Sequence, residues 1–309
     1  MKKRKHYLLL ILGIVALLST AVQASAAEGQ EKLGIKTISI GIVTQRSHAE
    51  MEPLLRDFIG YVARRLSPGE GIKGRVVVAP SVWALVKQLE QKQVDFYMDS
   101  PYPTYLINHQ NASVLLLRRW KGGSGDYRSV LFGKKGDGVA RLDDLPGKMV
   151  AFEDPGSTSG YFLPKLFLLR NGLKLVEKTS PEAAVPAGQV GFFFARSTNK
   201  IVDLVLAKTV AAGAFSNEDY DKLSEKRKEA ILILGETDYL PRNFLSVRKD
   251  LDPAVIGRLE DVLLAMHQDE EGRKVLQKTE GTTKFDVLPG GELAVRQKLV
   301  ELFGGMGQR

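Results

Sequence analysis

Along most of this sequence, short β-type runs alternate regularly with amphipathic helical segments. Residues 36–43 (KTISIGIV), 74–80 (GRVVVAP) and 94–100 (VDFYMDS) are short apolar runs typical of strands. Between them, residues 49–66 and 81–93 space their apolar side chains three and four positions apart, as in a helix. Strands that alternate with helices of this length predict a parallel sheet in an α/β architecture.

A second block of the same kind begins at residue 127, and a mainly helical tail follows it. Its predicted elements are strands at 127–135, 148–154, 210–215 and 230–236, helices at 159–171 and 218–230, and tail helices at 252–269 and 291–303. We therefore expect two lobes with a cleft between them: residues 27–124 plus 238–309 form lobe 1, and residues 125–237 form lobe 2. Two chain crossings should join the lobes, near residues 121–127 and near residues 237–243.

The first 26 residues have the organisation of a secretory signal peptide. Four basic residues at positions 2–5 precede an apolar stretch from Tyr7 to Leu18, and small residues then lead to Ala24-Ser25-Ala26. The alternative is a retained membrane anchor. Such an anchor needs roughly 20 apolar residues, and the apolar stretch here is shorter. We expect cleavage after residue 26 and export to the periplasm. Because cleavage removes four positive charges and no negative ones, the formal charge falls from +8 to +4.

Composition and motifs exclude several functional classes. The basic cluster at residues 118–123 is better explained as a solvated surface than as a groove for nucleic acid, which an exported protein is not expected to meet. The chain has no cysteine, and its four histidines show no metal-ligand spacing. Residues 156–160 do not match G-x-S-x-G, and LDDLPGKM does not match a Walker loop. With no catalytic constellation evident, the sequence favours a binding protein that needs no cofactor or metal.

One loop carries most of the functional signal. In EDPGSTSGYFLPKLFLL, residues 153–169, the small residues from Gly156 to Gly160 lie between a predicted strand and a predicted helix. Glycine lets the backbone approach a ligand closely, and the first amides of a helix have no intrahelical partner. With the hydroxyls of Ser157, Thr158 and Ser159, these amides predict a site for a phosphate-like anion. The alternative is an ordinary helix start, in which a serine or threonine is only the N-cap.

The same loop resembles the signature of the phosphate, phosphite and phosphonate-binding proteins that feed ABC importers. In that family, S-T-S-G and an aromatic residue open a helix of the second lobe. The resemblance extends over roughly residues 36–280 and includes VVVAPSVWALVKQLEQKQVDFYM and RSTNKIVDLVLAKTVAAGAF. It implies the two-lobed fold of a periplasmic binding protein, of the type II-like form, and an ABC permease as the membrane partner. It also implies that the clamp for the phosphonate group consists of Ser157, Thr158, Ser159, Gly160 and Tyr161.

The chain differs from this family at the residues expected to contact the ligand beyond its phosphonate group. Asp99, in YMDSPYPTY, stands where aminoalkylphosphonate binders carry an aromatic residue, and Ser197-Thr198-Asn199 replaces Ser-His-Asp. Ala211 and Asn243 replace two family acids, whereas Glu218 matches a family carboxylate that receives a ligand ammonium. The resemblance therefore implies an intact phosphonate clamp in a pocket that is otherwise rebuilt, with Thr198 as a further candidate contact.

Two charged residues of lobe 1 are candidate contacts, and each has a plainer alternative. Arg46, in the first strand-to-helix loop, could bind the anion with two hydrogen bonds or be an exposed loop arginine. Asp99 could face the cleft, or it could only end its strand in a turn. In the cleft it would repel a dianion, so it should share a proton with the ligand or hold a cation.

Tyr102 and Glu218 are two further candidate ligand contacts. Tyr102 could form a wall of the pocket, in a segment that Pro101 and Pro103 are expected to hold as a rigid loop. Glu218 could receive a ligand ammonium. Alternatively, Ser216 is the N-cap of the following helix, and Glu218 is then a first-turn acid that faces water.

Together these features predict a periplasmic solute-binding protein that binds a small phosphorus oxyanion by lobe closure and delivers it to a permease. Phosphonate is the expected ligand, with phosphite and phosphate as the other candidates. We expect a monomer that is not an enzyme. Two other classes stay open: a sensory protein that presents its closed form to a receptor, and a periplasmic hydrolase, which would turn over its ligand.

Overall fold

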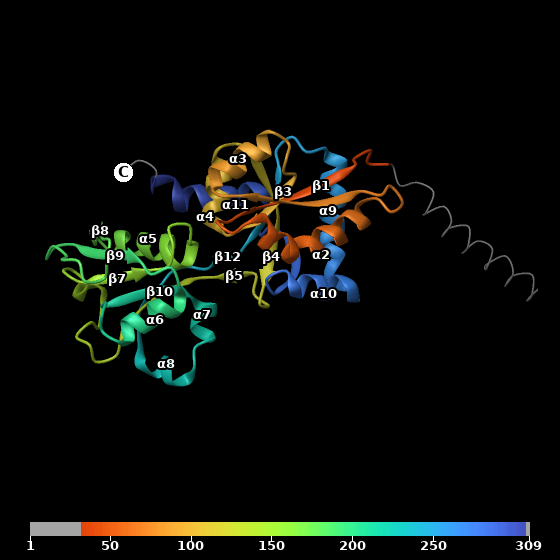
Figure 1. The fold of residues 1–309 in the computed structure, drawn as a ribbon. Helices are drawn as coiled ribbons and strands as arrows, with labels where there is room; N and C mark the ends of the chain where they lie inside the picture. The colour runs from red at the N-terminus through yellow and green to blue at the C-terminus, as the bar shows by residue number, and fades with distance from the viewer. Residues whose placement is uncertain (1–31, 307–309) are drawn as a thin grey trace, which may run out of the picture.

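The structure is a computed structural model that describes residues 32–306, and the predicted signal peptide lies outside the described residues. The chain forms two six-stranded sheets, each the centre of one lobe, with a two-stranded ladder between them (Figure 1). Within residues 32–306, no helix is both long enough and apolar enough to cross a membrane. The expected two-lobed α/β architecture is confirmed.

The first sheet has the strand order β14-β4-β13-β3-β1-β2. Its strands are β1 (Thr37–Val43), β2 (Lys73–Ala79), β3 (Phe96–Asp99), β4 (Ser113–Lys121), β13 (Phe244–Arg248) and β14 (Thr282–Val287). β1 pairs in parallel with β2 and β3, as the alternation predicted, and β13 lies antiparallel between β3 and β4. The sequence pattern did not reveal β4, β13 and β14, which complete this sheet.

Helices cover both faces of the first sheet. They are α2 (His48–Leu66), α3 (Val82–Glu90), α4 (Pro101–His109), α9 (Pro253–Ala265) and α10 (Glu270–Lys278). Residues of α2, α9 and α10 share one apolar core with the strands, and residues of α3 and α4 share another. The first turn of α2 is fixed by a capping box, in which the amide of Ser47 donates to the carboxylate of Glu50 at 2.8 Å.

The second sheet has the strand order β11-β6-β10-β7-β9-β8. Its strands are β6 (Ser129–Lys134), β7 (Met149–Phe152), β8 (Leu175–Glu177), β9 (Val190–Phe194), β10 (Ala212–Ser216) and β11 (Ile231–Glu236). β7 runs parallel to both β9 and β10, whereas β6 is antiparallel to its neighbours β10 and β11. The helical elements of this lobe are η2 (Thr158–Phe162), α5 (Leu163–Arg170), α6 (Thr198–Leu206), α7 (Asn217–Asp221) and α8 (Glu225–Ala230).

The chain passes between the two sheets after β4 and returns after β11. The two passages pair with each other as the short antiparallel strands β5 (Asp126–Tyr127) and β12 (Leu240–Pro241). We propose the lobe boundaries at residues 124/125 and 237/238, because these positions lie in the passages and outside both sheets.

The last helix, α11 (Gly291–Phe303), contacts both lobes. Its buried residues Leu299 and Phe303 belong to one apolar cluster with Tyr105 of α4 and with Leu163 of α5. The helix α11 thus packs against α4 of the first lobe and against α5 of the second.

Two local predictions were wrong. The segment around Pro101 and Pro103, expected as a rigid loop, begins helix α4, because both prolines fall in a first turn where the amides need no helical partner. Residues 218–230, expected as one helix, form α7 and α8, with Ser224 as the N-cap residue of α8. Ser216 caps α7 as predicted, and its Oγ accepts a hydrogen bond from the amide of Asp219 at 3.1 Å.

Candidate functional site

In each lobe a buried strand leads to a carboxylate, then to a serine in the N-cap position, and then into a helix. In the first lobe β3 ends at Asp99, and Ser100 precedes α4. In the second lobe Glu153 follows β7, and Ser157 precedes the helical segment formed by η2 and α5. Ligands of open α/β sheets bind at such carboxyl ends of strands, where helix N-termini point outward.

The two helix N-termini meet at Thr158. Its Oγ1 accepts a hydrogen bond from the amide of Tyr102 at 3.0 Å and donates one to Oγ of Ser100 at 3.1 Å. The ring of Tyr102 stacks on that of Phe162, and Thr158 itself is buried. The positive ends of two helix dipoles therefore face each other, so both would attract an anion held between them.

We call the meeting point of these two helix N-termini, around Thr158, Ser100 and Tyr102, the junction. Several hydrogen-bond donors there have no acceptor. Within residues 32–306, no hydrogen-bond partner is recorded for the amides of Thr158 and Ser159, which both belong to buried residues. The phenol oxygen of Tyr127 is buried near Thr158 without a well-aligned partner, and burial raises the pKa of this phenol, which keeps it protonated. An unpaired buried donor costs about 1–3 kcal/mol, and the oxygens of an oxyanion would satisfy all three groups.

Ser157 is a helix cap in this structure. Its Oγ accepts a hydrogen bond from the amide of Gly160 at 3.0 Å and donates one to Oε2 of Glu153 at 2.7 Å. Thr198, at the start of α6, donates to the other oxygen of Glu153 at 3.4 Å. A Cβ atom at Gly160 would lie 2.6 Å from Cβ of Glu153, so this close approach requires glycine. The capping alternative is thus realised at Ser157, while the amides of the next two residues stay free.

Asp99 lies beside the junction. Its Oδ1 accepts a hydrogen bond from the amide of Ser100 at 2.7 Å. Burial raises the pKa of Asp99 to about 6; the negative charge of Glu280 adds to the rise, while the Ser100 hydrogen bonds and Lys121 oppose it. The carboxyl group therefore gains and loses its proton close to neutral pH, where it could donate a hydrogen bond to an anion.

A pocket of about 580 Å³ is lined by residues of both lobes, including Lys121, Glu218, Arg242 and Glu280. The charges of Lys121 and Glu280 act on Asp99, and those of Arg242 and Glu218 act on Tyr127. Burial by itself would raise the pKa of Glu280, but Arg119 and Lys121, each with a nitrogen 3.1 Å from Oε2, lower it to about 2.

Glu218 does not face water, which corrects the first-turn alternative. Its Oε2 lies 2.7 Å from Nε of Arg242, and the two side chains are only 14% and 19% exposed. Burial raises the pKa of Glu218, and Arg242 opposes that rise. Oε1 is buried without a recorded partner. Arg242 supplies the positive charge that the sequence had assigned to a ligand ammonium.

Two of the predicted site residues, within residues 32–306, make no described hydrogen bond to Thr158, Ser100 or Tyr102. The side chain of Arg46 is 55% exposed and its Nε lies 3.6 Å from Glu50. Tyr161 packs in an aromatic cluster with Phe152 and Phe194, and its hydroxyl accepts a hydrogen bond from Lys165 at 2.9 Å. The structure thus brings together Thr158, Ser159, Tyr102 and Asp99, with Ser157, Gly160 and Thr198 beside them around Glu153.

Sequence reasoning missed four groups of the junction: Ser100, Lys121, Tyr127 and Arg242. Tyr127 and Arg242 lie in the two predicted crossing segments, where a side chain can reach both lobes. That position is the sequence signal that could have identified them as site residues. In the part of the chain that the structure describes, no group of three or more His, Asp or Glu side chains is arranged to hold a metal ion.

Two α/β lobes, paired passages between them and opposed helix N-termini define the class of two-lobed substrate-binding proteins. Comparison with protein families gives the same class: residues 40–288 match the model described as ABC transporter, phosphonate, periplasmic substrate-binding protein. The chain belongs to this family. Its members are described as periplasmic binding components of a transporter and not as enzymes.

Individual relatives are more distant. The phosphate-import protein PhnD of Mycolicibacterium smegmatis is 23% identical over 84% of this chain and 82% of its own length. XAC2383 from Xanthomonas citri, solved bound to ATP, is 27% identical with a TM-score of 0.78, over 89% of this chain and 98% of that chain. PhnD1 from Prochlorococcus marinus, solved with methylphosphonate, has a TM-score of 0.64 at 16% identity, over 89% of this chain and 99% of that chain, and so shares the fold.

Proposed function

We propose that this protein binds a phosphorus oxyanion between the N-termini of α4 and of the η2–α5 segment, with a phosphonate as the expected ligand. The observation that carries the proposal is the set of unpaired donors between two helix N-termini: the amides of Thr158 and Ser159 and the phenol of Tyr127. They converge where both helix dipoles are positive, so negative charge is favoured there.

The number of donors is sufficient for useful affinity. A hydrogen bond to a charged group contributes about 1.5–3 kcal/mol, and a micromolar dissociation constant corresponds to about 8 kcal/mol. About three to six donors are therefore needed. The two amides and the Tyr127 phenol supply three, and the hydroxyl of Thr158 adds a fourth once a ligand oxygen replaces Ser100 as its acceptor. Protonated Asp99 would be a further donor, and an incoming anion should raise its pKa further because two negative charges repel.

The oxyanion has to enter by a separation of the lobes. Thr158 of the second lobe is hydrogen-bonded to Ser100 and to Tyr102 of the first, so a ligand must part these contacts or replace them. The passages β5 and β12 are the natural hinge. Gly122 and Gly123, which precede β5, have φ values of +59° and +88°, and glycine tolerates the further changes in φ and ψ that a hinge motion requires.

A phosphate ester is a second candidate ligand. The pocket of about 580 Å³ between the lobes is larger than a one-carbon phosphonate requires. Three basic side chains (Lys121, Lys222 and Arg242) and three acidic ones (Glu218, Asp221 and Glu280) line it, so its size, and not its charge, favours a larger ligand. The ATP-bound XAC2383, at 27% identity, supports a ligand of this size. In this arrangement a terminal phosphate would occupy the junction at Thr158, and the rest of the ligand would extend into the pocket.

We propose that the mature protein works in the periplasm, as a monomer, and delivers its ligand to an ABC permease. Family membership supports the transport role. Growth on the ligand as sole phosphorus source should fail when the gene is deleted. Normal growth of the deletion strain, with an altered signalling response instead, would favour the sensory role.

The ligand proposal is tested by a thermal-shift panel of phosphate, phosphite, methylphosphonate, aminoethylphosphonate, ATP and sulfate. We expect at least one phosphorus oxyanion to raise the unfolding temperature more than sulfate does, because ligands that bind only the folded state stabilise it. A panel in which no phosphorus compound exceeds sulfate would refute the proposal.

A further inference from the structure

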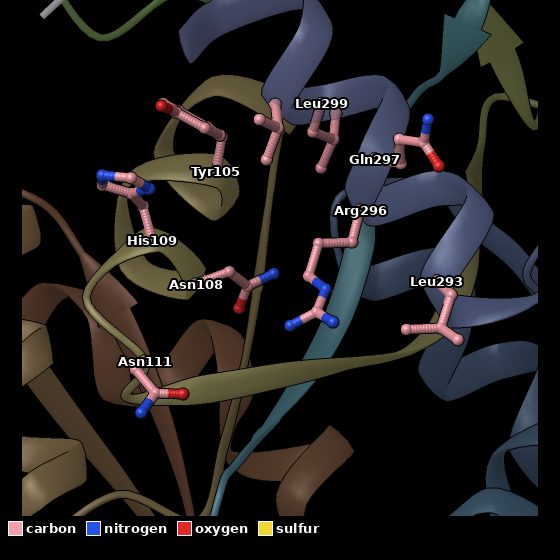
Figure 2. A pocket seen from close by; sticks show the side chains of 9 residues that line it. Tyr105, Asn108, His109, Asn111, Leu293, Arg296, Gln297 and Leu299 are labelled. Carbon is pink, nitrogen blue, oxygen red and sulfur yellow. The ribbon is translucent and has the colours of Figure 1, made fainter.

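A second pocket, of about 590 Å³, lies on the first lobe between α4 and α11 (Figure 2). It is lined by Tyr105 and Asn108 from α4 and by Leu293, Arg296, Leu299 and Val300 from α11, among others. No aspartate or glutamate lines it. The proposed oxyanion site makes no use of these side chains, so the pocket has to be explained separately.

The amide of Asn108 is held with its nitrogen unpaired. Ser113 donates a hydrogen bond from Oγ to Oδ1 of Asn108. Because this hydroxyl proton is used, the hydrogen bond of 3.0 Å between Ser113 and Tyr97 has the Tyr97 hydroxyl as donor. This chain fixes the carbonyl end of the Asn108 amide on Ser113. The other end, Nδ2, is buried and has no hydrogen-bond partner.

Arg296 presents further donors to the same space. Its Nε lies 3.4 Å from Oε1 of Glu292, and for its terminal nitrogens no partner is recorded in residues 32–306. Figure 2 shows the guanidinium group of Arg296 and the amide of Asn108 turned toward the same gap between the two helices. A guanidinium group matches a carboxylate through two parallel hydrogen bonds, and Nδ2 of Asn108 can donate a third.

Apolar side chains of α11 lie on either side of Arg296 in the pocket lining. On α11, the side chains of Leu293 and Val300 are 70% and 46% exposed, and both line the pocket. An exposed apolar surface beside fixed polar groups is typical of small-molecule sites, and the volume lies in their usual range.

We propose that this pocket binds a small organic monocarboxylate with an apolar chain. The carboxylate lies between the terminal nitrogens of Arg296 and Nδ2 of Asn108, where it accepts from both. The apolar chain lies along Leu299 and Val300, about one turn further along α11. The ligand carries no phosphorus, so this site is independent of the one at Thr158.

The test uses octanoate as the probe, with the mature protein in calorimetric titrations. We expect octanoate to bind with a millimolar or lower dissociation constant, and octanol to bind at least about tenfold more weakly because it lacks the charge. Arg296→Gln should weaken octanoate binding about tenfold or more. Arg141→Gln, at a 73% exposed arginine of the other lobe, is the matched control and should leave the binding unchanged.

A second variant separates ligand binding from folding. Asn108→Asp keeps an acceptor for Ser113 and places a carboxylate opposite Arg296, so it should abolish octanoate binding while the unfolding temperature stays the same or rises. The proposal is overturned if octanoate does not bind, if octanol binds as tightly, or if a folded Asn108→Asp protein retains the wild-type affinity.

Discussion

Single residues at the junction are shaped by burial. Thr158 and Tyr127 are buried, and neither the amide of Thr158 nor the phenol of Tyr127 has a well-aligned acceptor within residues 32–306. Such groups persist where something else completes their interactions, since an unpaired buried polar group is costly. This favours a ligand site over a purely structural contact between the lobes.

The raised pKa of Asp99 makes stability depend on pH. Its pKa is about 6 in the folded protein against an ordinary value of 3.8, so between these values the folded state holds a proton that the unfolded chain has released. The free energy of unfolding should therefore fall as pH rises from about 4 to about 7, by up to about 3 kcal/mol. Urea unfolding across this range measures it.

Asp99→Asn should remove that fall, because the amide keeps an acceptor for Ser100 but does not titrate. Asp143→Asn, at a side chain that is 76% exposed, is the control and should keep the fall. If the Asp99→Asn protein kept the wild-type pH profile, Asp99 would titrate normally and the raised pKa would be refuted.

The pairing of Glu218 with Arg242 predicts ligand preference. Since Arg242 already neutralises this carboxylate, a ligand ammonium gains little from it. We expect aminoethylphosphonate and ethylphosphonate to bind with affinities within about threefold of each other, a difference of well under 1.4 kcal/mol. Calorimetry on the wild type decides this. A clear preference for the amine that Glu218→Gln erases would restore the ammonium site.

At the scale of elements, the helix start after β7 combines two roles. Ser157→Ala removes the cap and should cost about 1 kcal/mol of stability. It also frees Glu153, whose carboxylate would then repel an anion at the helix N-terminus. We expect Ser157→Ala and Thr158→Ala each to weaken phosphonate binding about tenfold or more, measured by calorimetry.

Ser81→Ala is the matched control for this helix start. Ser81 caps α3, and its Oγ accepts a hydrogen bond from the amide of Ala84 at 3.2 Å, so the loss of stability should be similar. Binding should not change. If all three variants bind like the wild type, the segment at 157–160 is a helix cap and nothing more.

The sequence predicted the elements whose pattern is local, and it did not predict an element whose position depends on distant parts of the chain. Strands β1, β2 and β3 and helices α2 and α3 were evident because their periodicity is local. α4 was missed because the two prolines were taken to exclude a helix, although a first turn accepts them. β13 could not be foreseen, since its place between β3 and β4 depends on the return of the chain from the other lobe.

At the site, too, local features were predicted and contacts between distant residues were not. The loop at 157–160 was found from its own sequence, because a helix N-terminus and its hydroxyls are local features. Its partners Ser100 and Tyr102 lie 58 and 56 positions away from Thr158, and only the docking of the lobes brings them together. The pairing of Glu218 with Arg242 likewise spans the two lobes, and no local pattern encodes it.

In the whole molecule, ligand entry requires the two lobes to move apart. The hydrogen bonds of Thr158 to the first lobe and the stacking of Tyr102 on Phe162 hold the described conformation closed, so these contacts have to part for the lobes to open. We expect methylphosphonate to reduce the radius of gyration in solution scattering, as the lobes close on it. Scattering curves that coincide with and without saturating ligand would indicate a rigid module.

A crystal structure with methylphosphonate would show where the phosphorus lies. We expect phosphonate oxygens within hydrogen-bond distance of the amides of Thr158 and Ser159 and of the Tyr127 hydroxyl, between the N-termini of α4 and η2. A phosphonate bound elsewhere, with these three donors still unpaired, would contradict this expectation.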